Sequence, residues 1–117
     1  MFVLIKVKNV SYAVDDVHEA TAFYQDALGI TPQFVDGARW AQFRVDGSTF
    51  ALSAGEETPD GMEAGAVITF EVDNLVDFVR GLRDKGIAVS ELREMNGHGS
   101  TCWFRDPTGN VVQLYGR

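Results

Sequence analysis

The chain has 117 residues, a length that suits one domain of ordinary size, and 45% of them are hydrophobic. Its net charge of −7 argues against a nucleic-acid partner, because phosphates need a basic surface, and its single cysteine, Cys102, excludes an internal disulfide. No apolar run approaches the roughly 18 residues of a membrane span, so we expect no membrane partner and a cytoplasmic location.

The first half of the chain predicts a strand, a helix and three further strands. The apolar start, MFVLIKVKN, predicts a strand, and residues 10–14 continue the same pattern. Asp16 and Glu19 then form a capping box, which predicts the start of a helix. Apolar residues recur at helical spacing over residues 17–28, and Gly29 suits the left-handed end of a helix.

The second half repeats this order after an acidic, glycine-rich segment. Residues 10–17 align with residues 68–75 at an offset of 58, and FR at residues 43–44 aligns with FR at 104–105. In the second copy Asn74 is the expected helix cap and Gly86 ends the helix. We therefore expect a single domain of two βαβββ modules, residues 1–53 and 66–117, joined by a linker at 54–65.

Alternation along the predicted strands separates two sets of side chains. The apolar set should pack against the helices: Val10, Tyr12, Val14, Ala41, Phe43, Val45, Phe50, Leu52, Ile68, Phe70, Val72, Cys102, Phe104, Val112 and Leu114. The other set is mixed: Asn9, Ser11, Ala13, Trp40, Gln42, Arg44, Thr49, Ala51, Ser53, Val67, Thr69, Glu71, Thr101, Trp103, Arg105, Val111, Gln113 and Tyr115. A ligand cleft, a solvent-facing surface and a subunit interface are all compatible with the mixed set.

Two segments, ATAFYQDALGI and FRDPTGNVVQL, make the chain resemble the vicinal oxygen chelate superfamily of glyoxalases, bleomycin-resistance proteins and extradiol dioxygenases. The resemblance covers essentially the whole chain. It implies an α+β fold in which two βαβββ modules, related by a pseudo-twofold, form a U-shaped, partly closed mixed sheet. It also implies a homodimer. In the enzymes of this group a divalent metal is held by the first strand of each module, usually through histidine, and by the last strand, usually through glutamate.

The residues at these four positions depart from the metal-binding pattern. The first-strand positions carry Asn9 and Val67, and the last-strand positions carry Ala51 and Gln113. Alanine and valine have no donor atom, and amides are poor substitutes for the imidazole and carboxylate groups that hold zinc, nickel or iron. The histidines and Cys102 show no ligand spacing of their own, so we expect no metal and no other cofactor.

The leading hypothesis is a metal-free protein that binds a small molecule, which makes an enzyme the less favoured class. Its ligand would be a cationic aromatic antibiotic or metabolite, because Glu71 and the net charge are negative. The expected binding residues are Asn9, Trp40, Gln42, Arg44, Glu71, His98, Trp103, Gln113 and Tyr115. The alternatives are a metal-dependent lyase or dioxygenase, an isomerase with Glu71 as its acid–base group, and an interaction module whose tryptophan face is a dimer interface.

Overall fold

The computed structural model describes residues 7–59 and 65–117, and these form two compact units, one in each half of the chain. Most of the strand expected at the start of the chain, and part of the expected linker, lie outside the described residues. Within the linker the structure shows one short 3-10 helix, Gly55–Glu57. Among the described residues, neither helix has the length and apolar character needed to cross a membrane.

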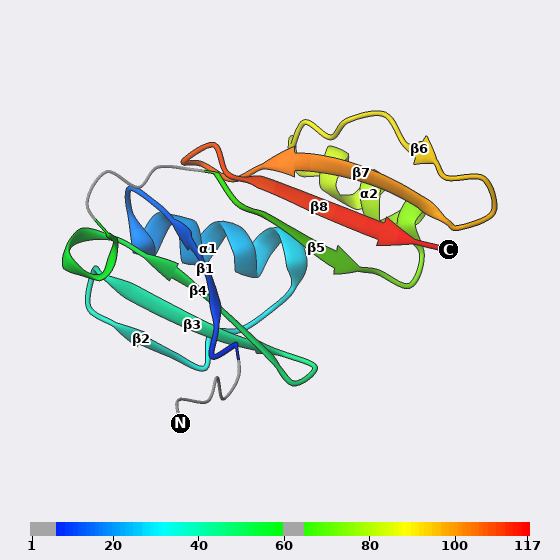
Figure 1. Cartoon of the computed structure of the whole chain (residues 1–117). Coiled ribbons are helices and arrows are strands. Elements are labelled where there is room, and N and C mark those ends of the chain that lie inside the picture. The colour runs from blue at the N-terminus through cyan, green and yellow to red at the C-terminus, as the bar shows by residue number, and fades with distance from the viewer. Residues whose placement is uncertain (1–6, 60–64) are drawn as a thin grey trace, which may run out of the picture. The chain divides into compact units, whose positions relative to one another are not determined.

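The first unit is a four-stranded sheet with one helix (Figure 1). Its elements are β1 (Val10–Ala13), α1 (Val17–Leu28), β2 (Phe34–Asp36), β3 (Trp40–Val45) and β4 (Ser48–Ser53). The strand order is β1-β4-β3-β2, with β1 parallel to β4 and the other pairs antiparallel.

The second unit repeats this architecture. Its elements are β5 (Val67–Glu71), α2 (Leu75–Asp84), β6 (Arg93–Glu94), β7 (Ser100–Arg105) and β8 (Val111–Gly116). The strand order β5-β8-β7-β6 is that of the first unit, and β5 is again parallel to its neighbour β8. The predicted α+β class and the two βαβββ modules are thus confirmed, while the curvature of the combined sheet stays a prediction.

The strand registers confirm the internal repeat residue by residue. Val10 pairs with Phe50 in the first unit, and Ile68, 58 positions after Val10, pairs with Val112 in the second. Phe43 also pairs with Phe50, and its repeat equivalent Phe104 also pairs with Val112. The two sheets therefore have the same strand pairing and differ in their side chains.

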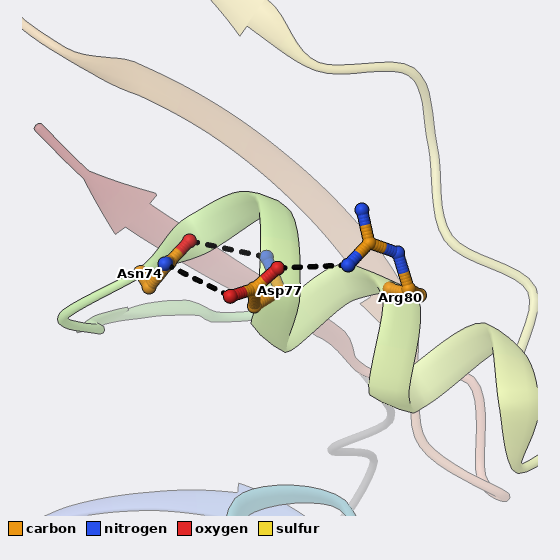
Figure 2. Close-up of polar contacts among 3 residues, drawn as sticks. All are labelled: Asn74, Asp77 and Arg80. Atoms are coloured by element: carbon orange, nitrogen blue, oxygen red, sulfur yellow. Dashed lines mark hydrogen bonds and ion pairs between the residues drawn. The ribbon is translucent and has the colours of Figure 1, made fainter.

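Both helices begin at the predicted caps. The Asp16 carboxylate accepts a hydrogen bond of 3.0 Å from the backbone N–H of Glu19, and Gly29 ends α1 in the left-handed region with φ of 70°. At the start of α2, Asn74 Oδ1 accepts from the backbone N–H of Asp77 at 3.2 Å, and Asn74 Nδ2 donates to the Asp77 carboxylate at 3.0 Å (Figure 2). Arg80 donates to the same carboxylate at 2.9 Å, so the first turn is closed by its own side chains.

The helices cover one face of each sheet, α1 against β3 and β4 and α2 against β8. The core of the first unit is aromatic: Tyr12 stacks near Tyr24 with ring centroids 6.1 Å apart, and Phe43 stacks on Phe50 at 4.9 Å. The core of the second unit is mostly aliphatic, with these residues buried: Leu75, Val79, Leu82, Cys102, Phe104, Val112 and Leu114.

The expected packing face needs one correction. Alternation predicts that Val10 packs against a helix, yet it is 44% exposed, because it begins β1, an edge strand. Val45, Ile68, Phe70 and Val72 are only half-buried. The remaining residues of the expected apolar set are buried.

Candidate functional site: the polar faces of the two sheets

Each sheet has a second face that does not pack against its helix, and we call these the first and second polar faces. Strand pairing places the following residues on the first polar face: Ser11, Ala13, Phe34, Asp36, Trp40, Gln42, Arg44, Thr49, Ala51 and Ser53. It places these on the second: Val67, Thr69, Glu71, Arg93, Thr101, Trp103, Arg105, Val111, Gln113 and Tyr115. The structure thus groups the predicted site residues of the strands by unit, and Asn9 immediately precedes β1.

A chain of amide contacts crosses the first polar face. Trp40 Nε1 donates to Gln42 Oε1 at 3.1 Å, and Gln42 Nε2 donates to Gln33 Oε1 at 3.1 Å. Both ends of the Gln42 amide are therefore engaged within the protein, and the indole N–H of Trp40 is used as well. A ligand could take the polar atoms of Trp40 and Gln42 only by breaking these existing bonds.

Ala51 lies at the centre of the first polar face. It pairs with Ser11 on one side and with Gln42 on the other, and its side chain is fully buried. A methyl group therefore occupies the last-strand position of this unit.

The second polar face is more open at its centre. Thr69, Gln113 and Trp103 lie in one row across β5, β8 and β7. Gln113 Nε2 donates to Thr69 Oγ1 at 3.1 Å, which orients the amide and leaves Oε1 as an acceptor. Trp103 is 42% exposed, so a large aromatic surface lies beside a half-buried amide.

The guanidinium of Arg105 lies over the Trp103 ring, with its central carbon 5.2 Å from the ring centroid. Arg105 also donates to the backbone oxygen of Gly109 at 2.8 Å, which ties its side chain to the turn between β7 and β8. A cation over an indole face is attracted by the ring quadrupole. The pair therefore gives the second polar face a fixed positive charge beside its exposed ring.

Tyr115 and His98 meet, though not through the histidine ring. The Tyr115 hydroxyl donates to the backbone oxygen of His98 at 2.7 Å. A Cβ added to Gly99 would lie 2.9 Å from atoms of the Tyr115 ring and hydroxyl, so only glycine lets the loop approach this closely. The tyrosine hydroxyl keeps its acceptor capacity but has already used its proton.

Glu71 lies in a different row from Arg105. It pairs with Tyr115, whereas Arg105 pairs with Val111 at the other end of β8. Glu71 is exposed. Glu71 therefore lies near one end of the second polar face and the backbone of Arg105 near the other end, while the Arg105 guanidinium lies over Trp103.

Sequence reasoning missed three residues of these faces, Phe34, Asp36 and Arg93, and also Gln33, which contacts the first face. Phe34 pairs with Gln42 on the first polar face and is 48% exposed, and Gln33 holds the Gln42 amide. Both belong to or adjoin β2, a strand of three residues that is too short to show alternation. The only signal was the pair of β-favouring residues FV after proline and glutamine.

A cavity of about 300 Å³ in the second unit lies elsewhere, around the start of α2. Its lining includes Asp73, Asn74, Leu75 and Gly116. The Asn74 side chain already caps the helix there (Figure 2), so it is not available to a ligand. The polar faces remain the stronger candidates.

A family model, described as the Glyoxalase/Bleomycin resistance protein/Dioxygenase superfamily, matches residues 6–114. The chain belongs to this superfamily. A comparison with curated proteins gives no match. The resemblance suggested by the helix end and by the turn before β8 is thus confirmed.

Solved structures of the glyoxalase superfamily share the fold at low sequence identity. A lactoylglutathione lyase from Agrobacterium tumefaciens has a TM-score of 0.80 at 18% identity, over 95% of this chain and 92% of that one. The fosfomycin resistance protein FosX from Listeria monocytogenes, an E126Q mutant complexed with Mn(II) and 1S,2S-dihydroxypropylphosphonic acid, has a TM-score of 0.75 at 16% identity, over 97% and 90% of the two chains. A possible glyoxalase from Bacillus cereus has a TM-score of 0.72 at 19% identity, over 96% and 99%. These likenesses establish the fold alone.

The metal that the superfamily implies does not fit the residues at the four equivalent positions. Ala51 offers a buried methyl group, and Val67 an isopropyl group that is 56% exposed. Asn9 and Gln113 are neutral amides, and the Gln113 amide is already bonded to Thr69. Two neutral donors, one in each unit, would leave a divalent charge uncompensated. Within the part of the chain that the structure describes, no cluster of three or more histidine, cysteine or acidic residues suits a metal ion.

Proposed function

We propose that the protein binds a planar small molecule without a metal ion, and that the second polar face carries the main contacts. The observation that supports this most directly is the exposed Trp103 ring beside Gln113, whose amide is oriented by Thr69 and keeps a free acceptor oxygen. Small-molecule sites are lined mainly by apolar and aromatic side chains with a few placed polar groups, and the combination of Trp103 and Gln113 matches that composition. Gln113 also occupies the last-strand position to which the family resemblance assigns a metal ligand.

The size of these contacts is compatible with modest affinity. Stacking on one ring contributes about 0.5–1.5 kcal/mol beyond the buried area, and each hydrogen bond to the amide about 0.5–1.5 kcal/mol. With the apolar area of the ring itself, the gross gain is at most about 8 kcal/mol, the value of micromolar binding, before the cost of association is subtracted, so a ligand must cover most of the exposed indole to bind. The proposal therefore favours fused-ring ligands over single small rings.

Tryptophan fluorescence tests the proposal, because each unit holds one tryptophan. Trp40→Phe leaves Trp103 as the only reporter, and Trp103→Phe leaves Trp40. Titration with a panel of planar, non-fluorescent ring compounds should quench or shift Trp103 in the first variant and leave Trp40 nearly unchanged in the second. If neither variant responds to any compound of a broad panel, the proposal is wrong.

A metal-dependent lyase or dioxygenase is the second candidate, and membership of the superfamily favours it. The similar structures include a lactoylglutathione lyase and a FosX complex with Mn(II). The donor chemistry of Asn9, Ala51, Val67 and Gln113 disfavours it, because two of them have no donor atom and the other two are neutral amides. Elemental analysis after dialysis decides the matter: stoichiometric zinc, nickel, iron or manganese retained by the protein would establish this candidate over the metal-free one.

The remaining predictions concern the assembly and the location of the protein. A homodimer and a cytoplasmic location are expected from the family resemblance and from the sequence. Sedimentation of the wild type and of Trp103→Ala separates a ligand site from a subunit interface. A dimer that dissociates on this substitution would mean that the second polar face is covered by a partner rather than open to a ligand.

A further inference from the structure

The charge of the ligand can be inferred from the position of Arg105, on the basis of the proposed function. The net charge of −7 and Glu71 point to a cationic ligand when the chain is considered as a whole. A ligand that stacks on Trp103, however, meets the charge nearest to that ring. The structure places the Arg105 guanidinium over that ring, with its central carbon 5.2 Å from the ring centroid.

Glu71 is too distant to dominate at this ring. Glu71 lies in the row of Tyr115 and Trp103 in the row of Gln113, so the two are two residues apart along β8 and two strands apart across the sheet. At about 3.3 Å per residue and about 4.8 Å per strand, their backbones are about 12 Å apart. The Debye length at physiological ionic strength is about 8 Å, so the field of an exposed carboxylate is largely screened over that distance.

Arg105 is also free to bind an acid. It spends one N–H on the backbone oxygen of Gly109, and among the described residues no carboxylate forms an ion pair with it. A guanidinium has five N–H donors in a planar fork that matches a carboxylate. The contact with Gly109 holds the side chain over the ring in advance of binding, which reduces the entropy lost when an anion arrives.

We infer that the second polar face takes an aromatic acid: the ring lies on Trp103 and the carboxylate pairs with Arg105. Gln113 Oε1 then accepts from a hydroxyl or amine on the ring, if the ligand carries one. A cationic group at the same place would face the guanidinium and be repelled. The acid therefore binds more tightly than an amine of the same shape.

Three naphthalene probes of one shape test the sign of the charge: 2-naphthoate, 2-naphthylmethylamine and the neutral 2-naphthalenemethanol. Binding is followed by NMR through the two indole N–H resonances, which Trp40→Phe and Trp103→Phe assign. The Trp103 resonance should respond most, and naphthoate should bind at least about threefold more tightly than the amine, as expected for an exposed charge pair.

Substitutions of two arginines distinguish a local contact with Arg105 from the effect of the net charge of the protein. Arg105→Gln should remove the preference for the acid over the amine. Arg105→Lys should still prefer the acid, but by a smaller factor. Arg44→Gln is the matched control, because Arg44 is the repeat equivalent of Arg105 and the change in net charge is the same. It should leave the preference intact.

The outcomes distinguish this inference from the proposed function. If the neutral alcohol or the amine shifts Trp103 as well as the acid does, the site exists but the inference is overturned. An equal loss of preference in Arg44→Gln and Arg105→Gln also overturns it. If no probe shifts either resonance, both the inference and the proposed function are wrong.

Discussion

The two units share a strand register and differ in the side chains that occupy it. Gln42 in the first unit corresponds to Trp103 in the second, and Ala51 corresponds to Gln113, since each pair faces the same neighbours in its sheet. At these positions the first unit is internally bonded and closed, while the second exposes a ring and an acceptor oxygen. The comparison shows that the repeated backbone fixes positions and leaves their chemistry free to diverge.

The cores differ in a similar way. In the first unit Phe43 stacks on Phe50 at 4.9 Å with an angle of 14° between the rings. In the second unit the equivalent pair is Phe104 and Val112, both buried. Equivalent positions of the two sheets therefore hold two aromatic side chains in the first unit, and one aromatic and one aliphatic side chain in the second.

The largest expected effect comes from truncating this pair. Phe43→Ala and Phe104→Ala should each lower the free energy of unfolding by about 3–5 kcal/mol, because a fully buried ring is lost. Phe43→Ala should cost about 1 kcal/mol more, because it also removes the stacked contact with Phe50. Urea unfolding followed by tryptophan fluorescence measures both free energies. In a Trp103→Phe background the reporter is Trp40, and in a Trp40→Phe background it is Trp103.

Leucine variants are the control for these truncations. Phe43→Leu and Phe104→Leu keep most of the volume, so they fold even if the alanine variants do not. An equal cost of the two leucine variants would mean that the aromatic pair of the first unit contributes nothing beyond its buried area.

The second expected effect compares the turns before the last strand of each unit. Asp106 is buried, and its carboxylate accepts from the backbone N–H groups of Thr108, Gly109 and Asn110 at 3.0, 2.9 and 2.8 Å, and from Asn110 Nδ2 at 2.9 Å. Asp106→Ala removes this acceptor from the turn, although the Gly109 N–H keeps its bond to the backbone oxygen of residue 106, and should cost about 3 kcal/mol. The same urea titration measures it through Trp103.

The first unit makes its turn by backbone conformation instead. Asp46 and Gly47 both have positive φ, 46° and 84°, as a two-residue hairpin of this hand requires. Asp46→Asn keeps that preference and should change stability by less than about 0.5 kcal/mol. If Asp106→Asn proves equally mild, the charge on Asp106 is not what holds the second turn.

Local patterns in the sequence were enough to predict much of this fold. The caps at Asp16 and Asn74 bond within their own first turns, and the repeat carries the register from one unit to the other. The exposure of Val10 could not be predicted, because it depends on where the edge of the sheet falls. Nor could the position of Arg105 over Trp103, since alternation gives the face of a side chain and not the direction in which it bends.

The last expected effect concerns Cys102, whose equivalent in the first unit is Ala41. Burial raises the pKa of the Cys102 thiol above its ordinary value, and the Arg83 guanidinium opposes this only in part. The folded state therefore holds the thiol proton more tightly than the unfolded state does. The stability linked to this proton is complete below the ordinary thiol pKa, about 8.5, and is lost as the pH rises above it, by at most about 1.4 kcal/mol per pH unit.

Cys102→Ala gives the second unit the residue of the first and removes the titration. Subtracting its unfolding free energies from those of the wild type at pH 7, 8.5 and 9.5 cancels the other ionising groups, and the difference should fall with pH. A difference that stays constant would show that Cys102 has the same pKa in both states.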